Sequence, residues 1–94
     1  MKTNFQMVRE LYKGFTPENK GFLNGEEVNM IKEKLCIPEM NILQLRNLRD
    51  FVVMFTSLKC KDGMPIREEM VERDKCSGIC AVIDNAIFAQ GGEV

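Results

Sequence analysis

Apolar side chains recur at every third or fourth position along much of the chain, which is the period of an amphipathic α-helix. In residues 3–14 the apolar stripe consists of Phe5, Val8, Leu11 and Tyr12. Thr3 or Asn4 precedes the stripe as a candidate N-cap, and Gly14, or the Thr-Pro pair after it, follows as a helix terminator. We therefore predict a first helix over residues 3–14.

A second apolar stripe follows a loop. It consists of Val28, Ile31 and Leu35. The stripe predicts a helix that begins at Asn24 or Gly25 and ends before Pro38. Residues 15–27 contain glycine, proline and asparagine, which are typical of a loop.

Residues 41–58 predict a third helix with Asn41 as its N-cap. Its inward stripe consists of Leu45, Leu48, Val52 and Phe55, and Leu58 extends it. After Asp50 the polar face nearly vanishes, because residues 51–55 are all apolar. One neighbouring helix cannot cover five consecutive apolar residues, so we expect this half to lie at the centre of a bundle or in a subunit interface.

Residues 65–90 predict a fourth, long helix, separated from the third by a turn at residues 59–63. Pro65 suits the first helical position, and Gly91-Gly92 ends the helix. The segment 76–89 is apolar or small nearly all round, and its polar exceptions are Ser77, Asp84 and Asn85. We predict that this segment is a buried helix.

The fold class predicted from these patterns is all-α, with about four helices in a single domain over residues 1–94. Residues 1–37 form an N-terminal helix-loop-helix in this prediction, and residues 41–90 form a long C-terminal antiparallel helical hairpin. The two-residue alternation that is typical of strands is missing.

Residues 8–35 resemble the helix-loop-helix of the EF-hand family. The matching positions are Gly21 for the sharp turn, Leu23 for the buried aliphatic residue and Glu27 for the closing glutamate. The resemblance implies a calcium-binding loop, whose first, third and fifth positions need oxygen ligands. Those positions hold Thr16, Glu18 and Lys20. Because lysine cannot ligate a cation, we expect either a calcium-free unit of similar shape or a coincidence.

Composition excludes several classes of function. The net charge of −1 gives no electrostatic attraction to duplex nucleic acid, so we expect no such partner. The longest apolar run, residues 51–55, is far too short to cross a membrane, and the N-terminus lacks the apolar core of a secretory signal. We therefore predict a cytoplasmic location, unless a leader was removed.

Catalysis is not expected from this sequence. Histidine is absent, which removes the commonest general base and metal ligand. The sequence also shows no nucleophile–base pair, no glycine-rich phosphate loop and no paired carboxylates on adjacent turns with apolar surroundings. We predict that the protein is not an enzyme.

The four cysteines are Cys36, Cys60, Cys76 and Cys80. Cys76 and Cys80 lie one turn apart on a continuous helix, where disulfide geometry is not readily met, so we expect reduced thiols. A four-thiolate zinc site usually draws on two Cys-x-x-Cys pairs, and the sequence has one close pair at another spacing. We predict buried, apolar cysteines, with no metal and no cofactor.

Two groups of polar residues are candidates for binding a ligand or a partner. Ser77, Asp84 and Asn85 form a polar notch in the apolar fourth helix, or else its solvent face or a surface for close backbone approach. Arg46 and Arg49 could bind phosphate or carboxylate, or else make ordinary surface pairs with neighbouring carboxylates.

In its compactness, its intracellular character and its lack of catalytic machinery, the chain resembles the small accessory proteins of bacteriophages that block or sequester host components, including inhibitors of defence systems. The resemblance implies a non-catalytic binding protein that inhibits a host protein in the host cytoplasm. We also expect a homo-oligomer formed through the apolar halves of the third and fourth helices. There are two alternatives. The first is an oligomeric sponge that sequesters a small phosphorylated signalling ligand, which Arg46, Arg49 and Asp84 would bind between subunits. The second is a calcium-insensitive EF-hand-like adaptor.

Overall fold

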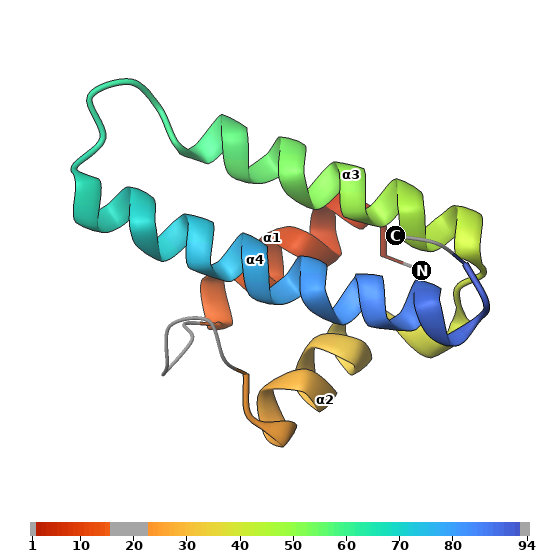
Figure 1. Cartoon of the computed structure of the whole chain (residues 1–94). Coiled ribbons are helices and arrows are strands. Elements are labelled where there is room, and N and C mark those ends of the chain that lie inside the picture. The colour runs from red at the N-terminus through yellow and green to blue at the C-terminus, as the bar shows by residue number, and fades with distance from the viewer. Residues whose placement is uncertain (1, 16–22, 93–94) are drawn as a thin grey trace.

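The computed structural model describes residues 2–15 and 23–92, and these contain four α-helices and one short 3-10 helix with no strand. The elements are α1 (Asn4–Gly14), α2 (Gly25–Lys34), η1 (Ile37–Glu39), α3 (Ile42–Lys59) and α4 (Ile66–Ala89). The predicted all-α class is therefore confirmed. The predicted C-terminal hairpin is also confirmed, because α3 and α4 pack closely as antiparallel neighbours (Figure 1).

Capping residues fix where three of the helices begin. Each N-cap side chain accepts a hydrogen bond from the backbone N–H of the residue three positions later. The side chain of that residue accepts a hydrogen bond from the backbone N–H of the N-cap in return. The pairs are Thr3 with Gln6, Asn24 with Glu27, and Asn41 with Gln44. Glu27, which matches the closing glutamate of an EF-hand, thus caps α2. The loop positions Thr16, Glu18, Lys20 and Gly21 lie outside the described residues.

The other helix ends show two differences from the prediction. Pro65 occupies the N-cap of α4 rather than its first helical position. After α2, Cys36 adopts a left-handed conformation with a φ of 55° and leads into η1, which the sequence pattern did not predict. Gly91 ends α4 as expected, since its φ of +85° suits a residue without a side chain.

The core collects apolar residues from every helix. The largest fully buried side chains are Tyr12, Leu11, Ile31, Leu35, Leu45, Leu48, Ile79, Ile83, Ile87, Val8 and Val52. Two residues assigned to inward stripes are instead exposed, Phe5 by 51% and Leu58 by 67%. Figure 1 shows why for Leu58, because the loop end of the α3–α4 hairpin extends beyond α1.

The prediction that residues 76–89 form a buried helix is right for one side of α4 and wrong for the other, where the alternative of a solvent face holds. The inward residues of this segment are buried, whereas Ser77, Ala81 and Phe88 are exposed. The neighbouring helices cover α4 on one side only (Figure 1). In α3, Val52 and Phe55 are likewise buried while Val53 and Met54 are exposed, so a subunit interface there stays a prediction.

Lys75 of α4 binds the C-terminal end of α1. Its Nζ donates a hydrogen bond to the carbonyl oxygen of Tyr12 at 2.8 Å and lies 3.7 Å from a carboxylate oxygen of Glu72. The ammonium also lies 5.8 Å from the centre of the Tyr12 ring. The last four carbonyls of a helix have no partner within it, so Lys75 satisfies one of them in α1.

We expect Lys75→Met to lower the free energy of unfolding by about 1.5–3 kcal/mol, the usual worth of a hydrogen bond to a charged group. Methionine keeps most of the apolar stem but leaves the Tyr12 carbonyl without its cation. Urea unfolding gives the value. The matched control is Lys61→Met, at an exposed position in the turn before α4, which should change stability by no more than about 0.5 kcal/mol. Equal stability of the two variants would contradict the structural role of Lys75.

Candidate functional site

A groove runs between α3 and α4, and its lining comes from these two helices alone. Its volume is about 480 Å³. Arg49 and Ser57 contribute from α3, and Arg73, Cys76, Ser77 and Asp84 contribute from α4. Thr56 and Cys80 lie at its floor, since both are buried and both line it. We call this feature the α3–α4 groove.

An ion pair joins the two helices at one end of the groove. The Nε of Arg49 donates a hydrogen bond to Oδ1 of Asp84 at 2.6 Å. This bond, together with the negative charge of Asp84, raises the pKa of Arg49. The pair is partly exposed, with 39% of the Arg49 side chain and 21% of the Asp84 side chain accessible. Solvent screening limits the contribution of such a pair to the stability of the fold to at most about 1 kcal/mol. We therefore expect its main effect to be on the orientation of the two side chains at the groove.

Two hydroxyl groups meet at the groove floor, that of Thr56 and, behind it, that of Tyr12. The hydroxyl of Thr56 donates a hydrogen bond to the backbone oxygen of Val52 at 3.0 Å and forms another hydrogen bond with the hydroxyl of Tyr12. Burial raises the pKa of Tyr12, which keeps its proton in place. α1 thereby contributes to the groove without lining it.

The two thiols of α4 have opposite protonation preferences. Their sulfur atoms lie 3.9 Å apart. The hydrogen bond from Cys80 is the main cause that lowers the pKa of Cys76 to about 6, with help from Thr56, Tyr12 and Arg49. The same hydrogen bond, and then burial, raise the pKa of Cys80. Because the two sulfur atoms share one hydrogen bond, ionisation of one thiol disfavours ionisation of the other, and the more exposed Cys76 is the one that this pairing and its surroundings favour as the thiolate.

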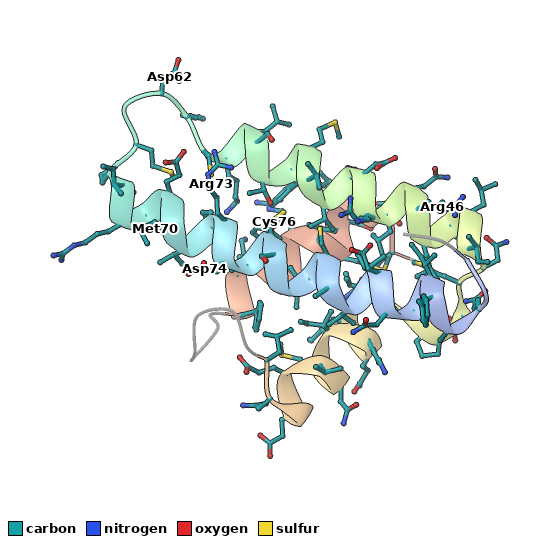
Figure 2. The ribbon with its side chains drawn as sticks, viewed as in Figure 1. Arg46, Asp62, Met70, Arg73, Asp74 and Cys76 are labelled. Carbon is teal, nitrogen blue, oxygen red and sulfur yellow. The ribbon has the colours of Figure 1, made fainter. Side chains whose placement is uncertain are left out.

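The structure brings together three of the five predicted site residues. Arg49, Ser77 and Asp84 all line the groove. Arg46 is exposed near the start of α3, away from the groove (Figure 2). Asn85 lies on another flank of α4, in a depression of about 300 Å³ beside Pro38 of η1.

Sequence reasoning missed the chemical part of the site. Arg73 is not among the predicted site residues, and the cysteines were predicted to be buried and apolar, whereas Cys76 is partly exposed and Cys36 is exposed. A signal was present, because Arg73 and Ser77, like Cys76 and Cys80, are four residues apart and share a face of the helix. The contribution of Tyr12 and Thr56 depends on the packing of three helices and has no local signal.

A second hollow lies between α1, η1 and the start of α3, with a volume of about 580 Å³. Its lining mixes both signs of charge, and Lys2 pairs with Glu10 across 2.6 Å. Both of these side chains are largely exposed. We therefore regard the α3–α4 groove, with its thiols and guanidinium groups, as the better candidate site.

Two further observations apply to residues 2–15 and 23–92. No three side chains of the metal-ligating kinds, cysteine, aspartate or glutamate, come together among them. None of the helices formed by these residues is long and apolar enough to cross a membrane.

Comparison with known proteins does not assign the chain to a family. No protein-family model matches it, and neither a curated protein nor a solved structure gives a significant match. The resemblances to EF-hands and to phage accessory proteins therefore stay predictions.

Proposed function

We propose that the protein is a non-catalytic helical binding protein that docks a helix of a partner protein in the α3–α4 groove. The observation that carries this proposal is the groove itself, which the packing of α1 and α2 leaves uncovered along the α3–α4 hairpin. A groove between two helices is a common site for a third, amphipathic helix.

The shape of the groove suits a helix. Ser57, Ser77 and Ala81 are small and exposed, so another backbone can approach α3 and α4 closely. Exposed Val53 lines the groove beside them and offers apolar contact. From residue 49 to residue 57 the groove follows α3 for about 12 Å at the helical rise, which accommodates about two turns of a docked helix.

The arginines of the groove can bind an acidic partner. Arg49 and Arg73 line it, and each contacts one carboxylate, that of Asp84 and that of Glu69, which leaves other N–H groups of each guanidinium for a partner. A guanidinium group binds carboxylates through two parallel hydrogen bonds. We therefore expect aspartate or glutamate on the docked helix, at the positions that face the two arginines.

Inhibition of a host protein is the biological role that we attach to this binding. It rests on the resemblance to phage accessory proteins, which also implies action in the host cytoplasm. Self-association belongs to the same proposal. The exposed apolar residues in the apolar halves of the two helices support it, and they are Met54 and Leu58 of α3 and Phe88 of α4.

A small phosphorylated ligand is the second candidate occupant of the groove. Its volume of about 480 Å³ lies within the usual range for small-molecule sites, and the hydroxyls of Ser57 and Ser77 accompany the two arginines. Native mass spectrometry of the purified protein, repeated under denaturing conditions, separates the candidates. Protein docking predicts subunit masses without an added ligand, whereas a ligand appears as extra mass that denaturation removes.

If extra mass is present, we expect Arg73→Gln to reduce ligand retention about tenfold or more, because a charge-assisted hydrogen bond is lost. Arg46→Gln is the matched control, since it removes the same charge outside the groove, and it should retain the ligand. Equal retention by both variants would refute a ligand site in the groove. If only Arg46→Gln lost the ligand, the ligand site would lie near Arg46, outside the groove.

A further inference from the structure

Two thiols meet at the floor of the α3–α4 groove. Cys76 and Cys80 lie on successive turns of α4, with their sulfur atoms 3.9 Å apart. Cys80 is only 8% exposed, whereas Cys76 is partly exposed and lines the groove beside Arg73 and Ser77 (Figure 2). A reagent that enters the groove therefore reaches Cys76 first.

Groups from three helices favour the ionised form of Cys76. The hydrogen bond with Cys80 has the largest effect, and the hydroxyls of Thr56 and Tyr12 and the charge of Arg49 add to it. These groups outweigh the partial burial of the sulfur, so the pKa of Cys76 falls to about 6. Since the thiolate is the nucleophilic form of cysteine, Cys76 is ready to attack an electrophile at neutral pH.

Cys80 is a poor competitor for the same chemistry. The hydrogen bond with Cys76 raises the pKa of Cys80 in the free protein, and burial, which remains in the adduct, raises it as well. A protonated thiol does not attack a disulfide. The two side chains also project from one continuous helix, a setting in which disulfide geometry is not readily met. A bond between Cys76 and a small molecule should therefore persist.

The surroundings of Cys76 favour reagents that carry negative charge. Arg73 lies one turn before Cys76 on α4, and Arg49 lines the groove from α3 beside Asp84. Each arginine already contacts one carboxylate, Arg49 that of Asp84 and Arg73 that of Glu69 at 3.1 Å. A guanidinium group carries five N–H donors, so it can bind a second carboxylate beside the first. The groove volume of about 480 Å³ has room for a ligand the size of a tripeptide.

We propose that Cys76 is a site of S-thiolation by small anionic disulfides, which the guanidinium groups of Arg49 and Arg73 hold in the α3–α4 groove. The Cys76 thiolate attacks one sulfur of the disulfide, and the new protein–sulfur bond forms as the original S–S bond breaks. The electron pair of the broken bond leaves with the second half as its thiolate, which takes a proton from water. The step thus oxidises Cys76 and reduces half of the reagent, with no other reactant.

The adduct would fill the space in which the proposed function places a partner helix. The thiol chemistry itself does not depend on that function, because it needs only the groove and its side chains. Failure of partner docking would therefore leave this inference standing, and failure of thiolation would leave the docking proposal standing.

Reaction with oxidised glutathione tests the site. The full chain is incubated with the reagent near neutral pH, and intact-mass and peptide mass spectrometry locate the adduct. We expect one glutathionyl group on Cys76 before any other cysteine reacts, although Cys36 is the more exposed thiol. Cys76→Ser should remove this early adduct, whereas Cys36→Ser should keep it. Earlier reaction at Cys36 or Cys60, or a Cys76–Cys80 disulfide as the main product, would overturn the proposal.

The pH dependence of alkylation tests the activation of Cys76. With iodoacetamide, the rate at Cys76 should rise with pH and level off above a midpoint near pH 6, because the thiolate is the reactive form. In the urea-unfolded chain the midpoint should lie near the ordinary thiol value of about 8.5. Cys80→Ser keeps a hydrogen-bond donor and should keep the low midpoint, whereas Cys80→Ala should raise it by about one pH unit or more. Equal midpoints for the two variants would contradict the role of Cys80.

A pair of reagents tests the selection for charge. Arg73→Gln should slow the reaction of Cys76 with anionic oxidised glutathione by about threefold to tenfold, because an attracting charge is lost. The rate at which Cys76 of the same variant reacts with the neutral 2-hydroxyethyl disulfide should change by less than about twofold, since that reagent carries no charge. Equal slowing of both reactions would show that Arg73 does not select the reagent, and would overturn that part of the proposal.

Discussion

Leu48→Ala should lower the free energy of unfolding by about 2–5 kcal/mol, the usual cost when a buried leucine is truncated and a cavity remains. Leu48 is fully buried in the middle of α3, where the hairpin packs against the rest of the core. Leu43→Ala is the matched control, because Leu43 belongs to the same helix but is 68% exposed. The free energy of unfolding of this variant should differ from that of the wild type by no more than about 0.5 kcal/mol.

Chemical unfolding of the two variants therefore tests which face of α3 packs against the core. Both substitutions remove the same atoms and have the same helix propensity, so only the packing differs. If the two variants lost similar stability, α3 would not present the face to the core that the structure shows. The groove, which lies on a neighbouring face of α3, would then be misplaced as well.

Ala81→Glu should reduce partner binding about a hundredfold, which is the loss typical of a central interface position. The new side chain would occupy the groove between α3 and α4 and would repel the acidic helix that we expect there. Because Ala81 is exposed, the variant should fold with nearly unchanged stability. Quantitative capture of host proteins, with wild type and variant compared band by band, measures the loss.

Leu43→Glu is the matched control for this experiment. It adds the same charge at another exposed position of the hairpin, outside the groove. We expect it to retain the partner that Ala81→Glu loses. If both variants bind as well as the wild type, the groove is not the docking surface, and if both lose binding, net charge rather than the groove is responsible.

The sequence predicted the helices well because their signals are local. The N-cap residues and the helical period of the apolar stripes identified four helices, and the helix bounds agree to within a few residues. The exposed face of α4 was only one of the alternatives that the sequence left open, because Ala81 and Phe88 on that face are apolar and give little contrast with the buried side. Which face is covered depends on where α1 and α2 pack, and that is a tertiary property.

The candidate site was only partly predictable for the same reason. Arg49 and Asp84 were each identified, but their pairing depends on the register of the α3–α4 hairpin, since 35 residues separate them. The pKa of Cys76 is lowered first by Cys80 of the same helix and then by Thr56 from α3 and Tyr12 from α1, which the fold alone brings close to it. Residues far apart in the sequence thus produce the chemical character of the groove.

The central claim, that the α3–α4 groove is the docking surface, is tested most directly by photo-crosslinking from single positions. A photoreactive amino acid at position 81 lies in the groove, and the same amino acid at position 43 lies on α3 outside it. We predict that illumination of the protein in host lysate gives a discrete crosslinked partner from position 81 and none from position 43. A partner crosslinked from position 43 but not from position 81 would contradict the account.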